Sequence, residues 1–183
     1  MQKEFNFVFL DRDGVINTNG FVNVPSEFEF IHRSIDALRL LNEFGKKVFV
    51  ATNQGGIESG YLTDQTLHTI HACMEEQIHA AGGNISKIYY CPHFSTPCEC
   101  RKPKPGMLIE GLNTFNLRHA AESECCFIGD SITDWQAAIA AGIHPIAVQS
   151  GCTYDKDALL FIKEHDIPVY ADLYEAVTDL LLV

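Results

Sequence analysis

Short apolar runs alternate with helix-patterned segments along most of the chain, and this alternation limits the possible folds more than any other feature. Runs typical of buried strands occupy residues 5–10, 47–51, 85–90, 125–128 and 144–148. Apolar residues spaced three or four apart predict helices over residues 34–44, 63–81, 105–117 and 132–141. Beyond about residue 155 we expect a helix, a short strand near Val169 and a final helix. This order predicts an α/β fold with a mainly parallel sheet and helices on both faces.

Two segments do not follow the alternation. Residues 17–30 are polar and aromatic, and we expect them to form a flap just after the first strand. Residues 91–105 form a loop with no room for a helix or strand of its own. The chain has no internal repeat and no low-complexity segment. Residues 1–183 are therefore predicted to form a single domain, which suits the length of 183 residues.

The charge balance excludes some classes of partner. The chain has 13 Lys and Arg residues against 24 Asp and Glu residues, a net charge of −11. This balance argues against a protein that binds nucleic-acid backbones, but carboxylates can bind a divalent cation that in turn binds a phosphate. No apolar run approaches the ~20 residues of a membrane span, and residues 1–6 are not typical of a signal peptide. We expect a cytoplasmic protein that binds neither nucleic acid nor membrane.

Acidic and hydroxyl side chains follow three of the predicted strands. Asp11 and Asp13 follow the first, Thr52 ends the second, and Asp130 ends the fourth. Ligands of open parallel sheets bind beyond the carboxyl ends of the strands, so these side chains are expected to converge. Close carboxylates share a proton or hold a cation, Mg²⁺ prefers oxygen ligands, and a carboxylate beside such a cation can attack phosphorus. The alternative is that Asp130 or Ser131 simply caps the following helix.

Four segments near these strand ends carry the chemistry: FLDRDGVIN, VATNQGG, CRKPKPGM and FIGDSITD. In order and spacing they resemble the four motifs of the haloacid dehalogenase-like (HAD) phosphatases, over about residues 5–150. The resemblance implies a Rossmann-like fold and phosphoryl transfer through an aspartyl-phosphate. It implies Asp11 as the nucleophile, and Asp13 as the general acid and then the base. Thr52 would hydrogen-bond the phosphoryl oxygens and Lys102 would neutralise their charge, as the electrostatics of this transfer require.

The same resemblance implies a magnesium site. Asp11, Asp130 and the main-chain carbonyl of Asp13 would bind Mg²⁺, and Asp134 would support them. The cation and the ammonium of Lys102 would together remove the repulsion between a carboxylate nucleophile and a phosphate.

Little of the chain is available for a cap domain. The segment before residue 34 holds the flap, and the segment after the third strand holds the loop at residues 91–105. We therefore expect a capless enzyme in which Asn17, Asn53 and Arg101 contact the substrate.

The loop at residues 91–105 contains a metal-binding pattern. Three cysteines and a histidine lie within ten residues: Cys91, His93, Cys98 and Cys100. Three thiols and one imidazole suit a closed tetrahedral Zn²⁺ site, which is structural because no coordination position stays open. The last ligand directly precedes Arg101 and Lys102, so the zinc is expected to aim these two cations at the phosphate site.

This cluster resembles that of the zinc-containing branch of the family, which includes D-glycero-D-manno-heptose-1,7-bisphosphate 7-phosphatases and histidinol-phosphate phosphatases. The flap residues and CRKPKPGM are closer to the heptose enzymes, whereas the four-residue gap between His93 and Cys98 is nearer the histidinol enzymes. Ser131 and Glu58 stand where the heptose enzymes commonly carry basic residues, which removes positive charge near a second phosphate.

The sequence therefore predicts a monomeric, Mg²⁺-dependent phosphomonoester hydrolase that acts on a small phosphorylated sugar. Removal of the 7-phosphate from D-glycero-D-manno-heptose 1,7-bisphosphate is the leading hypothesis, and hydrolysis of histidinol phosphate is the alternative. A non-catalytic protein that keeps the HAD scaffold is a third hypothesis, against which the intact acidic and cationic motif residues argue.

Overall fold

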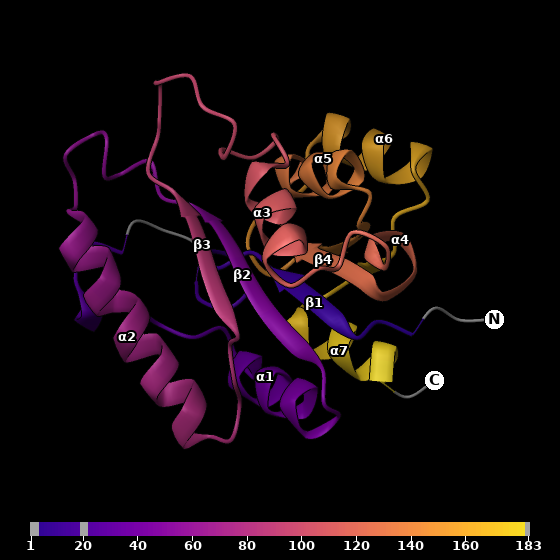
Figure 1. The fold of residues 1–183 in the computed structure, drawn as a ribbon, viewed down its shortest axis with the longest axis horizontal. Coiled ribbons are helices and arrows are strands. Elements are labelled where there is room, and N and C mark those ends of the chain that lie inside the picture. Colours follow the sequence, from indigo (N-terminus) through magenta and orange to yellow (C-terminus); the bar gives the residue numbers. More distant parts are fainter. Residues whose placement is uncertain (1–3, 19–21, 182–183) are drawn as a thin grey trace.

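The strands form one parallel sheet with the order β3-β2-β1-β4-β5-β6. The computed structural model describes residues 4–18 and 22–181. The strands are β1 (Phe7–Leu10), β2 (Lys47–Asn53), β3 (Lys87–Cys91), β4 (Cys125–Gly129), β5 (His144–Val148) and β6 (Val169–Tyr170). The chain starts in the middle of the sheet, winds outwards to β3, and returns across β1 to build the other half (Figure 1). The switch of direction beside β1 opens a crevice at the carboxyl ends of β1, β2 and β4.

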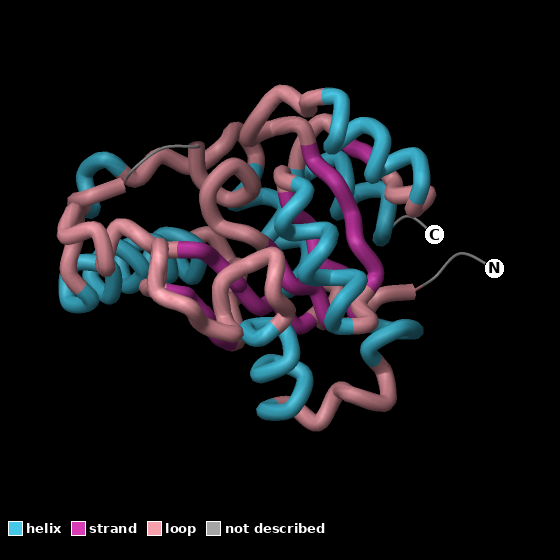
Figure 2. The backbone as a smooth tube through the Cα atoms, turned by 90° about the horizontal axis from the view of Figure 1, so that it is seen from above, coloured by secondary structure: helices cyan, strands magenta, loops and turns pink. Residues whose placement is uncertain are grey.

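Helices flank the strands on both sides (Figure 2). They are α1 (Ser34–Glu43), α2 (Asp64–Ala80), α3 (Gly106–Thr114), α4 (Ala121–Glu124), α5 (Ile132–Ala141), α6 (Lys156–Glu164) and α7 (Leu173–Leu181), with a 3₁₀ turn η1 at Pro25–Glu27. Apolar side chains of α1, α2 and α7 pack on one face of the sheet. Those of α3, α4 and α5 pack on the other, and α6 packs against α5 and β5.

The two faces of the sheet explain the apolar runs. Side chains of a strand point alternately to opposite faces, so Val8 and Leu10 of β1 enter the core under α1 and α7. Phe9, between them, enters the core under α3 and α5, where its ring lies 4.8 Å from that of Phe49. Burial on both faces accounts for strands that are apolar at nearly every position.

The predicted order of strands and helices is confirmed, with differences at some ends. Thr63 caps α2 by accepting a hydrogen bond from the Thr66 amide. β2 continues to Asn53, beyond the predicted end at residue 51. The four-residue helix α4 was not predicted, because one turn carries no periodic signal.

Residues 19–21 of the expected flap at residues 17–30 lie outside the described residues. Its described part contains η1, and Asn17 pairs with Phe30 across its base. The loop after β3 runs to α3 without a helix or strand. Within residues 4–18 and 22–181, no helix has the length and apolar character needed to cross a membrane.

Gly111 tests how closely α3 packs on the sheet. A Cβ at this position would lie 2.7 Å from Cε1 of Phe9 and 3.3 Å from Tyr89. Gly111→Ala gains up to about 1 kcal/mol of helix propensity, but overpacking costs about 1–3 kcal/mol. We expect a net loss of stability in chemical denaturation. Glu110→Ala, at an exposed position of the same helix, is the control and should leave stability nearly unchanged. A Gly111→Ala protein as stable as wild type would show that the helix is less tightly seated.

Candidate active site

The carboxyl ends of β1, β2 and β4 border an open cavity of about 700 Å³. Asp11 and Asp13 enter it after β1, Thr52 from β2, and Asp130 directly after β4. Lys102 reaches the same place from the loop before α3. The convergence expected from the strand ends is therefore present, and residues far apart in sequence share one wall.

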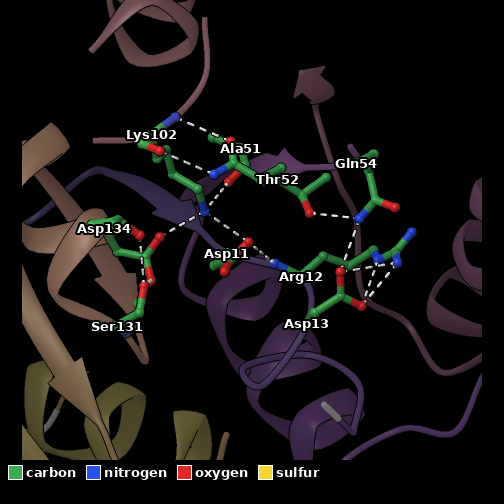
Figure 3. A network of polar contacts seen from close by, with 12 residues as sticks. Asp11, Arg12, Asp13, Ala51, Thr52, Gln54, Lys102, Ser131 and Asp134 are labelled. Atoms are coloured by element: carbon green, nitrogen blue, oxygen red, sulfur yellow. Dashed lines mark hydrogen bonds and ion pairs between the residues drawn. The ribbon is translucent and has the colours of Figure 1, made fainter. Parts of the chain in front are cut away.

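Lys102 lies at the centre of this arrangement (Figure 3). Its side chain is 2% exposed, and its ammonium lies 2.9 Å from Oδ1 of Asp11 and 2.6 Å from Oδ1 of Asp134. The ammonium also donates a 2.9 Å hydrogen bond to the carbonyl of Ala51. Burial alone would lower the pKa of Lys102, but Asp11 and Asp134 outweigh it and raise the pKa. The cation is thus fixed in its charged form beside the proposed nucleophile.

Three carboxylates crowd the same place. One oxygen each from Asp11, Asp130 and Asp134 lies within 4.8 Å of the others. Burial raises the pKa of Asp11 to about 8 and that of Asp130 to about 7; repulsion from Asp134 adds to both shifts, while Lys102 opposes them. Buried carboxylates that repel one another are stabilised by a bound cation.

Two glycines leave room for the Asp130 carboxylate. A Cβ at Gly151, or at Gly14 where φ is +85°, would overlap the carboxylate of Asp130. The clustered carboxylate oxygens of Asp11 and Asp130 fit a divalent cation, and Mg²⁺ is the cation that prefers such oxygen ligands. Asp134 is already engaged by Lys102, and it accepts a hydrogen bond from the amide of Ser131.

Asp13 is held by donors on both of its oxygens. Arg12 donates through Nη2 to Oδ1 at 2.8 Å and to Oδ2 at 3.0 Å, with Nε 3.2 Å from Oδ1. Asn17 donates to Oδ1 at 2.9 Å and Gln54 to Oδ2 at 2.8 Å. Gln54 also donates to Oγ1 of Thr52 at 2.9 Å. Arg12 and Gln54 were not predicted as site residues, although both lie inside the motifs that carry Asp13 and Thr52.

The residues expected to contact the substrate lie in different places. Asn17 is fully buried behind Asp13 and does not line the cavity. Asn53 lines the cavity, but its side-chain amide clasps the main chain of Lys102, accepting from its N–H at 3.0 Å and donating to its carbonyl at 3.2 Å. Arg101 lines the cavity and donates through Nη1 to the carbonyl of His93 at 2.8 Å.

The cysteine and histidine side chains after β3 form a compact cluster. Its four ligand atoms, from Cys91, His93, Cys98 and Cys100, lie within 4.8 Å of one another. Sγ of Cys91 is 3.7 Å from Sγ of Cys98, and Nδ1 of His93 is 3.5 Å from Cys91 and 3.4 Å from Cys100. Sulfur atoms bound to one tetrahedral Zn²⁺ are about 3.8 Å apart, given Zn–S bonds of about 2.3 Å. Sγ of Cys100 lies closer to Sγ of Cys91, at 2.9 Å, so this pair would have to move apart around a bound ion. The donor set, and the separation of Cys91 from Cys98, fit zinc.

Glu58 also binds this loop, at residues 94–96. Its carboxylate accepts hydrogen bonds from the amides of Phe94, Ser95 and Thr96 and from the hydroxyls of Ser95 and Thr96. These bonds, chiefly that from the Thr96 hydroxyl, lower the pKa of Glu58 to about 2. Glu58 does not line the cavity, so its charge is directed at the loop rather than at a bound phosphate.

Ser131 combines two positions. Its hydroxyl and amide bond the Asp134 carboxylate in a capping box that begins α5, which confirms the capping alternative for this residue. Ser131 also lines the cavity, where it adds no positive charge. Asp130 makes no such cap, and its carboxylate faces Asp11.

A parallel sheet with clustered carboxylates and a buried lysine at its switch point is the arrangement expected of a HAD-like hydrolase. Residues 99–176 match the family model described as HAD-hydrolase-like. The D-glycero-beta-D-manno-heptose-1,7-bisphosphate 7-phosphatase of Neisseria meningitidis (strain Z2491) is 39% identical over 94% of this chain and 90% of its own length. The enzyme of the same name from Escherichia coli K12 is 38% identical over 78% of each chain.

Solved structures agree with these relatives. The D,D-heptose 1,7-bisphosphate phosphatase of B. bronchiseptica, complexed with magnesium and phosphate, has a TM-score of 0.87 and 31% identity over 97% of this chain and 99% of its own. The corresponding enzyme of Burkholderia thailandensis has a TM-score of 0.64 and 29% identity over 96% and 98%. The chain belongs to the HAD phosphatase family.

The zinc cluster gives a prediction for Cys98→Ser. Removing one of four ligands should abolish the binding of one equivalent of zinc in metal analysis. It should also lower the melting temperature by about 5 °C or more, because metal binding stabilises the folded state that presents the ligands. Cys73→Ser, a half-buried cysteine on α2 outside the cluster, is the control. Full zinc content in Cys98→Ser, or zinc-free wild-type protein prepared without chelator, would contradict the site.

Proposed function

We propose that this enzyme removes the 7-phosphate from D-glycero-β-D-manno-heptose 1,7-bisphosphate with Mg²⁺, through an aspartyl-phosphate on Asp11. The Lys102 to Asp11 ion pair on the cavity wall carries this proposal, since it sets a carboxylate beside a buried cation where a phosphate can enter. The names of the curated relatives support the choice of substrate.

In the first step an oxygen of Asp11 attacks phosphorus and the bond to the sugar oxygen breaks. The Lys102 ammonium compensates the charge of the phosphoryl group as it approaches the carboxylate. Mg²⁺, when bound by Asp11, Asp130 and the Asp13 main-chain carbonyl, supplies further neutralisation of that charge. Asp134 holds Lys102 from the side opposite Asp11 and so keeps the ammonium in line.

Asp13 transfers the protons of the reaction, and Thr52 binds the phosphoryl group. Asp13 gives a proton to the leaving sugar oxygen, and later takes one from the water that hydrolyses the aspartyl-phosphate. Oγ1 of Thr52 accepts its hydrogen bond from Gln54, so its own O–H remains to donate to a phosphoryl oxygen. Gln54 therefore couples the orientation of Thr52 to that of Asp13.

Arg101 is proposed to bind the second phosphate of the substrate. Its guanidinium lines the cavity and lies 5.5 Å from the centre of the Phe94 ring, which is itself exposed at the cavity edge. The zinc cluster and Glu58 fix the loop that carries both residues. Arginine suits this task because its planar donors match phosphate oxygens in pairs.

We further propose that the chain acts as one monomeric domain in the cytoplasm, on a small metabolite rather than a nucleic acid. Its seven cysteines form no disulfide, which suits a reducing compartment, and a net charge of −11 disfavours polyanionic partners.

Asp11→Asn tests the nucleophile. The amide is nearly isosteric but does not attack phosphorus, so kcat should fall by more than about 10³-fold, in line with the loss of a covalent nucleophile. Far-UV circular dichroism should show an intact fold. Asp157→Asn, an exposed position on α6, is the matched control and should keep full activity. Substantial turnover by Asp11→Asn would exclude the aspartyl-phosphate.

A substrate comparison tests the specificity. Values of kcat/KM are measured for both anomers of heptose 1,7-bisphosphate, heptose 7-phosphate, fructose 1,6-bisphosphate and histidinol phosphate. The β-anomer of the heptose bisphosphate should exceed each of the others by at least about tenfold, since a paired second phosphate adds roughly 1.5 kcal/mol or more. A preference for histidinol phosphate would support the alternative and overturn the proposed substrate.

A further inference from the structure

His71 is a buried histidine that the proposed reaction does not use. It lies on α2, outside the motifs, and is 5% exposed. Its Nε2 is 3.1 Å from Nη1 of Arg12, and its ring packs edge-on to Tyr90 with ring centres 6.3 Å apart. The imidazole thus meets the side of Arg12 that points away from Asp13.

The contact with Arg12 defines the chemical state of the imidazole. A guanidinium has N–H donors and no acceptor, so Nε2 of His71 must be the acceptor and carry no proton. The proton then resides on Nδ1, and the ring is neutral. Burial and the charge of Arg12 lower the pKa of His71 to about 3. If the ring were protonated, its Nε2–H would point at the Nη1–H of Arg12, and two positive charges would lie in contact.

Arg12 connects this imidazole to the proposed acid and base. The Arg12 side chain is 1% exposed, and it divides its donors between two partners. Nη2 and Nε hold the Asp13 carboxylate, and Nη1 meets His71. A buried N–H without an acceptor costs about 1–3 kcal/mol, so His71 favours the one orientation of the guanidinium that also clamps Asp13.

We propose that His71 is a positioning residue for the proton-transfer step, acting through Arg12 on Asp13. This inference rests on the proposed phosphatase reaction. In that reaction Asp13 transfers its proton to the sugar oxygen as the phosphorus–oxygen bond breaks and the phosphoryl group passes to Asp11. A misdirected Asp13 delivers that proton poorly, and the step slows when the leaving oxygen is basic.

The charged and titratable groups around His71 are few. Arg12 and Asp13 face it from the loop after β1, and His68 lies one turn earlier on α2. On its other side His71 borders a cavity of about 240 Å³, together with Glu75 of α2 and with Lys87 and Tyr90 of β3. Among these described neighbours, Arg12 is the group that links His71 to the active-site cavity.

The experiment compares leaving groups. Values of kcat/KM are measured for a sugar phosphate and for p-nitrophenyl phosphate, whose phenolate departs with little help from an acid. Because kcat/KM covers the steps up to departure of the leaving group, the later attack of water does not enter. His71→Phe keeps a ring but removes the acceptor. It should lower kcat/KM for the sugar phosphate by at least about tenfold, and for p-nitrophenyl phosphate by less than about threefold.

Two variants act as controls. His71→Gln restores an acceptor near the position of Nε2 and should recover most of the activity on the sugar phosphate. His68→Phe, at an exposed position of the same helix, should leave both substrates unaffected. If His71→Phe does not fold, His71→Leu replaces it with the same expected pattern, and melting temperatures are recorded for every variant.

The outcomes separate this inference from the proposed function. An equal loss on both substrates, or no loss on either, would overturn the role of His71 while leaving the phosphatase intact. A His71→Gln protein as impaired as His71→Phe would do the same. Absence of turnover in the wild-type enzyme on both substrates would instead overturn the proposed function itself.

Discussion

The site depends on the ammonium of Lys102, which lies between the carboxylates of Asp11 and Asp134. Three elements meet there: the end of β1, the loop before α3, and the first turn of α5. Without the cation, the two buried carboxylates would face each other with no compensating charge. Removing one partner of a buried ion pair destabilises a protein by about 3–5 kcal/mol. The interaction therefore ties β1, the loop before α3 and α5 together at this edge of the sheet, and it sets the electrostatic environment of the proposed nucleophile, Asp11.

The placement of this one cation explains features that lie outside the cavity. Asn53 clasps the main chain of Lys102, and the cysteine and histidine cluster ends two residues before it. Glu58 accepts hydrogen bonds from the amides of Ser95 and Thr96 in the same loop. The Glu58 carboxylate, and the cysteine and histidine cluster when it binds zinc, thus stabilise a loop that has no helix or strand of its own. The acidic net charge of the chain is compatible with a phosphate site, because Arg101 and Lys102 place positive charge on the wall of the cavity.

Much of the fold could be predicted from the sequence because most strands are short and apolar and alternate with periodic helices. The convergence of Asp11, Thr52 and Asp130 also follows from their places at strand ends. The directions of individual side chains could not be predicted, since nothing in a linear pattern indicates that Arg12 turns toward the distant His71 or that Asn17 turns inward to bind Asp13. For the same reason the sequence does not show that the Glu58 carboxylate accepts hydrogen bonds from the loop that contains Thr96.

In the proposed reaction Asp11, beside Lys102, takes the phosphoryl group onto its own carboxylate. Rapid acid quench of the enzyme during turnover of ³²P-labelled substrate, followed by peptide mapping, tests for this intermediate. We predict label on the peptide that contains Asp11, released by hydroxylamine as expected of an acyl phosphate. Enzyme that turns over at full rate with no label on that peptide, or with label on another residue, would exclude an aspartyl-phosphate on Asp11.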